Sequence, residues 1–461
     1  MCERRILLCV GVMLLGVGTL QAATENLIAN PEFNTADGRT VPEGWSVWTP
    51  QWSPAACRVR GTADGLLVDS SGDPYAVGGA VQSVRGIRPR QAYRISAVCE
   101  LRAIEWPFQS VIVRVNWLKG DDLILPAGML VRGPTVDGAI ARFGDVLVSP
   151  EGTDAAQMVL ELKWPGGGTV VWKHIEMQAV PDPAPRKVRI GTVYLRPRQS
   201  TPDNNLKLWC EQIDAAGKLG LDIVCLGEAI TQVGTNASTQ DVAEPVPGPT
   251  TQRLGEAAKS NHLWIVASLS ERVGEVVYNT AVLIDRQGRL AGAYRKVHLP
   301  REEWKQGVRP GGEYPVFDTD FGRVAIQICY DWFFPEATAI FASKGAEVIL
   351  SPTWGDTLPD ADGKANGETV FRVRARDNGV YMAPCVYDGN SLVIDPMGRI
   401  LASSAGKTGV FWAEVDLNRW RPPAAPALLR ERTSRAAASG LWLDWTHDQP
   451  LPTARRPDLP V

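Results

Sequence analysis

Short runs of alternating hydrophobic and polar residues fill the first part of the chain. In residues 92–98, 110–117 and 168–172, β-branched and aromatic residues alternate with polar ones, and Gly, Pro and Asp separate the runs. No long stretch in this region repeats at the helical period. Because such alternation is typical of half-buried strands, the pattern predicts an all-β domain, an antiparallel β-sandwich, over residues 24–180.

The pattern changes after the proline-rich segment 181–186, which predicts a stiff linker. From residue 187, strand-like runs alternate with stretches that repeat at helical spacing, and two hairpins follow. These predicted elements are strands at 187–194, 221–227 and 263–269, helices at 203–219 and 251–261, and hairpins at 279–296 and 391–402. Strand–helix alternation is typical of layered α/β domains. We therefore predict an α/β domain over residues 187–420, followed by a tail, 421–461, rich in Pro, Ala and Arg.

The first residues have the order of a secretory signal. Charged residues precede an apolar run from Ile6 to Leu20, and the small residues Ala22 and Ala23 follow. This order predicts a signal peptide at residues 1–22 and export to the periplasm or the extracellular space. The competing interpretation is an uncleaved membrane anchor, but glycines interrupt the run and it is short for a bilayer span.

Composition narrows the possible partners and cofactors. The 48 basic and 51 acidic residues give a net charge of −3, which provides no basic surface for nucleic acid. With four histidines and no closely spaced ligand pairs, the sequence does not predict a zinc site. Six cysteines remain after the signal, too few for a disulfide scaffold. Cys57 and Cys99 are either paired or two buried thiols, and the sequence leaves both possibilities open.

Three strand-like segments end on a reactive side chain. They deliver the carboxylate of Glu228, the ammonium of Lys296 and the thiol of Cys329. Open α/β layers place their sites at strand ends. A cysteine at a sharp bend between a strand and a helix is accessible to substrate and faces backbone N–H groups.

These segments resemble the nitrilase, or carbon–nitrogen hydrolase, superfamily, in particular its amidase and carbamoylase branches. The matching motifs are Gly227-Glu228, residues 294–300 (Tyr-Arg-Lys-Val-His-Leu-Pro) and residues 328–336 (Ile-Cys-Tyr-Asp-Trp-Phe-Phe-Pro-Glu). The resemblance implies a four-layer αββα sandwich that pairs through its outer helices into a homodimer or a larger homo-oligomer. It also implies a small-molecule amide substrate and neither a metal nor an organic cofactor.

A carboxylate, a lysine and a thiol can together cleave an amide through a thioester. Glu228 is expected to act as general base, and Lys296 and the backbone N–H of Tyr330 to hold the oxyanion. The resemblance further implies a second glutamate shortly after the lysine. Glu303 is the candidate, and the adjacent Glu302 is the alternative. Trp354, together with the aromatic residues that follow the nucleophile, predicts a partly apolar substrate pocket.

Other interpretations stay open at this point. A Cys-His-acid hydrolase would use His298 or His262 as its base. Nitrile hydrolysis is an alternative to amide cleavage, although nitrile-hydrolysing members typically carry Cys-Trp-Glu at the nucleophile.

The start of the first domain, residues 26–48, resembles carbohydrate-binding jelly rolls, which implies a carbohydrate as a second partner. A secreted glycan-binding protein with an inactive hydrolase domain is therefore a further alternative. Four tryptophans are candidates for a sugar-stacking platform, although aromatic residues of β-sandwiches are usually core. They are Trp45, Trp48, Trp52 and Trp106.

Overall fold

The computed structural model describes residues 25–35, 40–125, 128–355 and 367–418. The predicted signal peptide and the predicted tail, residues 421–461, lie outside the described residues, so both stay predictions. Within the described part of the chain, no helix is long and apolar enough to cross a membrane.

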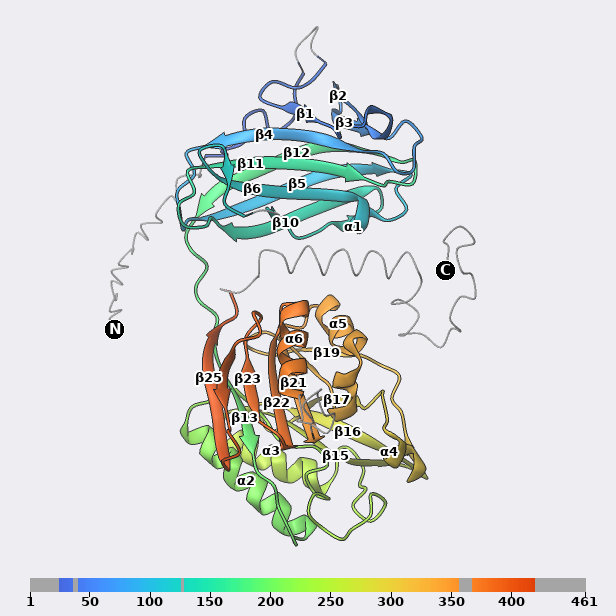
Figure 1. The fold of residues 1–461 in the computed structure, drawn as a ribbon, viewed down its shortest axis with the longest axis vertical. Coiled ribbons are helices and arrows are strands. Elements are labelled where there is room, and N and C mark those ends of the chain that lie inside the picture. Colours follow the sequence, from blue (N-terminus) through green and yellow to red (C-terminus); the bar gives the residue numbers. More distant parts are fainter. Residues whose placement is uncertain (1–24, 36–39, 126–127, 356–366, 419–461) are drawn as a thin grey trace, which may run out of the picture.

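Two antiparallel sheets make up the first part of the chain (Figure 1). In spatial order, the first sheet contains β1 (Ser46–Trp48), β4 (Val77–Arg85), β11 (Ala155–Lys163), β6 (Val111–Lys119) and β7 (Asp122–Leu123), and β8 (Met129–Leu130) also pairs with β6. The second contains β2 (Arg58–Thr62), β3 (Gly65–Asp69), β12 (Thr169–Val180), β5 (Ala92–Arg102), β10 (Ile140–Val148) and β9 (Thr135–Asp137). Two short helices, η1 (Ser53–Ala55) and α1 (Pro107–Ser110), lie in the connections. Strands thus dominate this region, and the jelly-roll character stays a prediction.

One hydrophobic core fills this first part, and it decides two questions that the sequence left open. Cys57 and Cys99 are both buried free thiols, and burial raises the pKa of each to about 12. Trp45 is also a core residue, because only 6% of it is exposed and its ring lies 5.1 Å from that of Phe33. Of the two possibilities that the sequence left for Trp45, a sugar-stacking platform or the core, the structure shows the core.

The second part of the chain, from residue 187, contains two mixed sheets packed face to face. One contains β17 (Leu290–Arg295), β16 (Val276–Ile284), β15 (Trp264–Val273), β14 (Ile223–Cys225), β13 (Lys187–Tyr194) and β25 (Gly409–Asp416), and β18 (Val308–Arg309) pairs with β16. The other contains β19 (Val316–Asp318), β20 (Arg323–Ile326), β21 (Val348–Gly355), β22 (Tyr381–Asp388), β23 (Leu392–Ile394) and β24 (Ile400–Ser403). In each sheet the central strands run parallel, β13 to β15 in the first and β20 to β22 in the second.

Helices cover the outer face of each sheet (Figure 1). On one side lie α2 (Pro202–Lys218) and α3 (Pro249–Asn261), and on the other α5 (Pro335–Ser343) and α6 (Gly367–Asn378). The predicted four-layer αββα order is confirmed. The short helices α4 (Arg301–Lys305) and η2 (Cys329–Phe333) lie in connections that follow β17 and β20.

The local sequence explains where α2 begins and which face it buries. The hydroxyl of Thr201 accepts the N–H of Asn204 at 3.2 Å, and Pro202 occupies the first turn, where a missing N–H costs nothing. Trp209, Ile213 and other residues at helical spacing are buried against the sheet. The helix therefore anchors the sheet that carries the first strand end of the site.

Candidate active site

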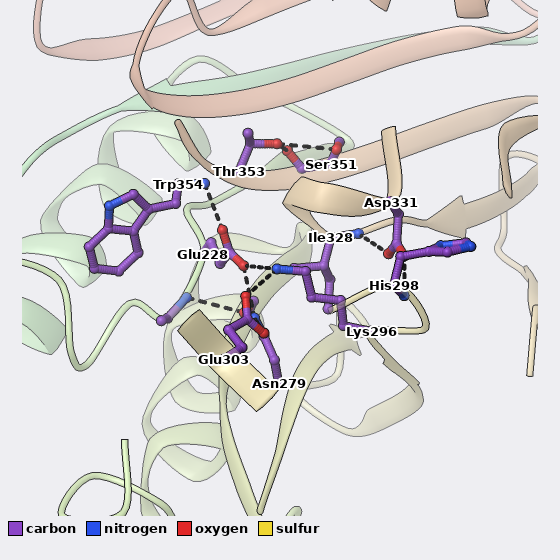
Figure 2. Close-up of polar contacts among 12 residues, drawn as sticks. Glu228, Asn279, Lys296, His298, Glu303, Ile328, Asp331, Ser351, Thr353 and Trp354 are labelled. Carbon is purple, nitrogen blue, oxygen red and sulfur yellow. Dashed lines mark hydrogen bonds and ion pairs between the residues drawn. The ribbon is translucent and has the colours of Figure 1, made fainter. Parts of the chain in front are cut away.

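The three reactive side chains predicted at strand ends meet at one edge of the facing sheets. Glu228 follows β14, Lys296 follows β17, and Cys329 follows β20 and opens η2. The Lys296 Nζ donates to Glu228 Oε1 at 2.9 Å, and both side chains are almost fully buried (Figure 2). The charges of both groups also act on the nearby Cys329 thiol. The structure thus brings together the residues that the sequence singled out from three segments between residues 228 and 329.

The backbone bends sharply where two of these residues leave their strands. Strand β14 ends at Cys225, earlier than predicted, and the chain turns further along, at Ala229, whose φ is 46°. Cys329 itself has a φ of 40°, a left-handed conformation that costs about 1 kcal/mol or more in a residue other than glycine. This strained bend is the strand-to-helix turn that the sequence predicted for the nucleophile.

Asp331 holds this bend against the segment that carries Lys296. Its side chain is fully buried and accepts the backbone N–H of Ile328 at 2.9 Å and both the backbone N–H and the ring Nδ1 of His298, at 3.0 and 2.9 Å (Figure 2). It also accepts the hydroxyl of Tyr294 at 2.8 Å. His298 therefore contacts Asp331 rather than the carboxylate of Glu228. This arrangement gives no support to His298 as the base, and His262 lies at the end of α3.

Burial and charge set the protonation states in the site. Burial raises the pKa of the Cys329 thiol, and the negative charge of Glu228 raises it further, so the resting group is a thiol and needs a base. Burial alone would lower the pKa of Lys296, but the nearby carboxylates outweigh it and the pKa is raised, so the ammonium stays charged. For Glu303, burial raises the pKa more than Lys296 lowers it.

The choice between Glu302 and Glu303 is a matter of helix register. Glu303, on α4, forms a short ion pair with the Nζ of Lys296, whereas Glu302 on the same helix is exposed to solvent. The structure therefore places Glu303, and not Glu302, in the site.

The two aromatic candidates occupy different places. The backbone N–H of Trp354, in β21, donates to Glu228 Oε2 at 2.7 Å, while its indole is 37% exposed and points away from Lys296 (Figure 2). Tyr330 follows the nucleophile, and its ring packs against Phe333 and Phe334. Trp354 thus contacts Glu228 through its backbone, and its side chain is partly exposed to solvent.

Sequence reasoning missed Asn279, on β16. Its Nδ2 donates to Glu228 Oε1 at 2.8 Å and to Glu303 Oε2 at 3.3 Å. The position carried no signal of a site, because its partners Glu228 and Glu303 lie on distant segments of the chain. Among the described residues, no group of three or more His, Cys, Asp and Glu side chains is arranged to hold a metal ion.

Comparison with known proteins identifies the family. The family model for carbon–nitrogen hydrolases matches residues 189–424, about half of the chain. The omega-amidase NIT2 of Mus musculus is 30% identical over 239 residues, which are 48% of this chain and 86% of the relative. The nitrilase of Pyrococcus abyssi is 33% identical over 246 residues, 50% of this chain and 90% of the relative. The crystal structure of an amidase from Nesterenkonia sp. superposes with a TM-score of 0.44 at 24% identity, covering 51% of this chain and 93% of the amidase.

The family match spans both sheets of the αββα unit and contains all three strand ends. Its extent establishes the family of the chain. The first part of the chain, residues 25–180, lies outside that match. The chain belongs to the carbon–nitrogen hydrolase family of the nitrilase superfamily and is a hydrolase that acts on carbon–nitrogen bonds other than peptide bonds.

Proposed function

We propose that the protein cleaves a non-peptide amide or an N-carbamoyl bond through a thioester on Cys329. The observation that carries this proposal is the buried ion pair of Lys296 with Glu228, placed beside a thiol whose raised pKa demands a base. A carboxylate and an ammonium held against one thiol supply the base and the oxyanion partner that acyl transfer needs.

In the first half-reaction, the Cys329 sulfur attacks the amide carbon while its proton moves to Glu228. Negative charge develops on the carbonyl oxygen, which Lys296 and the backbone N–H of Tyr330 stabilise. Glu228 then gives its proton to the leaving nitrogen, the carbon–nitrogen bond breaks, and ammonia or an amine departs from the thioester. In the second half-reaction, Glu228 takes a proton from water, which attacks the thioester carbon. The carbon–sulfur bond then breaks, the acid departs, and the proton on Glu228 returns to the Cys329 sulfur.

The amide is preferred over the nitrile as substrate class. The relatives are named as omega-amidases in several animals, and Cys-Tyr-Asp at the nucleophile resembles the amidase and carbamoylase branches. Nitrile hydrolysis stays the alternative, because a relative of similar identity is named as a nitrilase.

The experiment is a substrate panel with two readouts. Simple amides, N-carbamoyl amino acids and nitriles are offered to the full chain, released ammonia is measured, and intact mass reports the acyl adduct. The adduct should map to Cys329 and disappear in Cys329→Ala. The other described cysteines are buried, so they provide no competing site. Turnover of nitriles alone, or an adduct on another residue, would contradict the proposal.

A second candidate function, carbohydrate binding, concerns the first part of the chain. Three of the four candidate tryptophans carry exposed side chains, Trp48 at 38%, Trp52 at 72% and Trp106 at 37%. Exposed indoles offer flat apolar faces on which sugar rings stack. Co-sedimentation with insoluble polysaccharides tests this role, and Trp52→Ala should weaken retention, whereas binding that is indifferent to that change would argue against it.

The proposal also includes export of the chain and its assembly into a homodimer or a larger homo-oligomer. The charged, apolar and small-residue order of residues 1–22 supports export, and cleavage is expected near Ala22. Fractionation with N-terminal mass analysis of the mature protein tests this, and an intact N-terminus in the cytoplasm would refute it. Light scattering coupled to size exclusion tests the homodimer or larger oligomer that the family resemblance implies, and a monomeric mass would refute that part.

A further inference from the structure

The side-chain amide of Asn279 lies between the two carboxylates of the site. Its Nδ2 donates one hydrogen to Glu228 Oε1 at 2.8 Å and the other to Glu303 Oε2 at 3.3 Å (Figure 2). We propose that Asn279, locked by Ser268, is a positioning residue that places the negative charge of this carboxylate pair on Glu228, so that Glu303 takes the first proton. The inference rests on the proposed function, because it concerns Glu228 as the base.

Ser268, on β15, fixes which way the amide points. Its hydroxyl donates to Asn279 Oδ1 at 2.7 Å and accepts the backbone N–H of Ala229 at 3.1 Å. If the amide were turned over, its oxygen would face two carboxylates that can only accept, and the Ser268 hydroxyl would lose its acceptor. Ser268 is fully buried, so water cannot replace the lost bond. The orientation follows from hydrogen-bond chemistry alone.

The surroundings of the two carboxylates are unequal. Glu228 accepts from Lys296, from Asn279 and, through Oε2, from the backbone N–H of Trp354 at 2.7 Å. Glu303 accepts from Lys296 and, at the longer distance, from Asn279, while burial raises its pKa. Hydrogen bonds to the charged form of a carboxylate favour that form, so the carboxylate that accepts more of them, Glu228, keeps the charge.

The groups that face Glu228 come from every element packed around it. Lys296 follows β17, Glu303 lies on α4, Cys329 opens η2, and the Tyr387 hydroxyl on β22 donates to the backbone oxygen of Glu228. Lys296 is shared by both carboxylates and therefore cannot by itself decide between them. Two carboxylates that share one cation bind protons as a coupled pair. A neutral donor that lies closer to one of them favours the charged form of that carboxylate.

The test compares Asn279→Leu with a matched variant on the same strand. Leucine shares the branching of asparagine at Cγ but is larger and has no donor. Thr280→Val removes the neighbouring buried hydroxyl, which donates to Glu271 rather than to the site, so it reports structural damage alone. Ser268→Ala leaves Asn279 in place and removes only the hydroxyl that fixes the orientation of its amide. Ser268→Thr restores the hydroxyl.

Two profiles against pH are recorded for each variant, kcat/KM for an amide and the rate at which iodoacetamide alkylates Cys329. In Asn279→Leu the acid limb of both profiles should move up by about one pH unit, a tenfold loss at low pH that recovers at high pH, since one hydrogen bond to a charged group is worth about that much. Ser268→Ala should move the acid limb by less, and Ser268→Thr should restore its original position. Thr280→Val should leave the acid limb where it is in the unmodified protein.

A loss in Asn279→Leu that is equal at every pH would overturn the proposal, because it would show a structural role only. If Asn279→Leu does not fold, the Ser268 pair decides by the same criterion. If no amide is turned over by the unmodified protein, the proposed function fails, and the alkylation profile still decides the role of Asn279.

Discussion

Replacing Asp331 by asparagine should damage the site as well as the fold. The aspartate accepts four hydrogen bonds in full burial, two at each oxygen. An amide keeps one acceptor and turns its NH2 toward either Ile328 or His298. The Tyr294 hydroxyl or the His298 ring can switch to accepting, but in either orientation one backbone N–H stays unpaired.

The magnitude follows from this count. An orphaned buried N–H costs about 1.5 kcal/mol, and each of the three remaining bonds loses about 0.5 kcal/mol because its partner is no longer charged. The expected loss of stability is therefore about 3 kcal/mol. Because Ile328 directly precedes Cys329, the strained bend should shift, and a displacement of about 1 Å at a reacting atom costs about 100-fold in kcat.

A buried aspartate far from the site provides the control. Asp395 is 1% exposed and accepts from the backbone N–H groups of Met397 and Arg399 and from the Arg399 side chain in the turn between β23 and β24. Asp395→Asn should lower stability by a comparable amount and leave kcat unchanged. Thermal melts and kcat, measured well below both melting temperatures, separate the effects. If Asp331→Asn keeps its kcat, or if both variants lose kcat equally, the positioning argument is refuted.

Three further outcomes are expected. Glu228→Gln should abolish amide turnover while His298→Ala keeps much of it, because the backbone N–H of His298 still binds Asp331; the reverse result in a turnover assay would reassign the base. Trp354→Ala should raise KM more than it lowers kcat, since the backbone N–H that serves Glu228 remains, and steady-state kinetics would show otherwise. Burial would raise the pKa of Glu271, but hydrogen bonds from an arginine and a threonine to its charged form outweigh burial and lower the pKa. The contribution of Glu271 to folding stability is therefore present above the usual carboxyl range and is lost as pH falls through the lowered pKa. Glu271→Gln should flatten acid unfolding curves below about pH 4, and an unchanged slope would contradict this.

The features that sequence could predict are those in which one segment carries its own signal. The strand ends at Glu228 and Cys329 follow apolar runs whose length and composition define a buried strand, and Lys296 ends a strand of a predicted hairpin. Helix α2 was predicted at 203–219 and is found at Pro202–Lys218, because its apolar spacing and its proline start lie within the segment itself.

The rest depends on contacts between distant segments. Asn279 and Ser268 are polar residues of two neighbouring strands, and only the antiparallel register of β15 and β16 places one beside the other. Glu303 and Glu302 differ by one position on α4, and the direction of a single helical turn decides between them. Trp45 and Trp48 lie three residues apart, yet Phe33 covers only the first. No local pattern contains any of these facts.

Under the proposed mechanism, the charge balance of the site gives a reason for a second carboxylate and a neutral amide around one lysine. When Glu228 takes the thiol proton, its negative charge leaves the pair with Lys296, and an equal charge appears on the substrate oxygen. Lys296 then turns from the base to the oxyanion while it stays bonded to Glu303 through the same Nζ, and the carboxylates around it keep its pKa raised. The total charge in the buried site does not change during this transfer, so the surrounding dipoles need little rearrangement. Asn279 contributes by keeping that charge on Glu228 until the thiol gives up its proton.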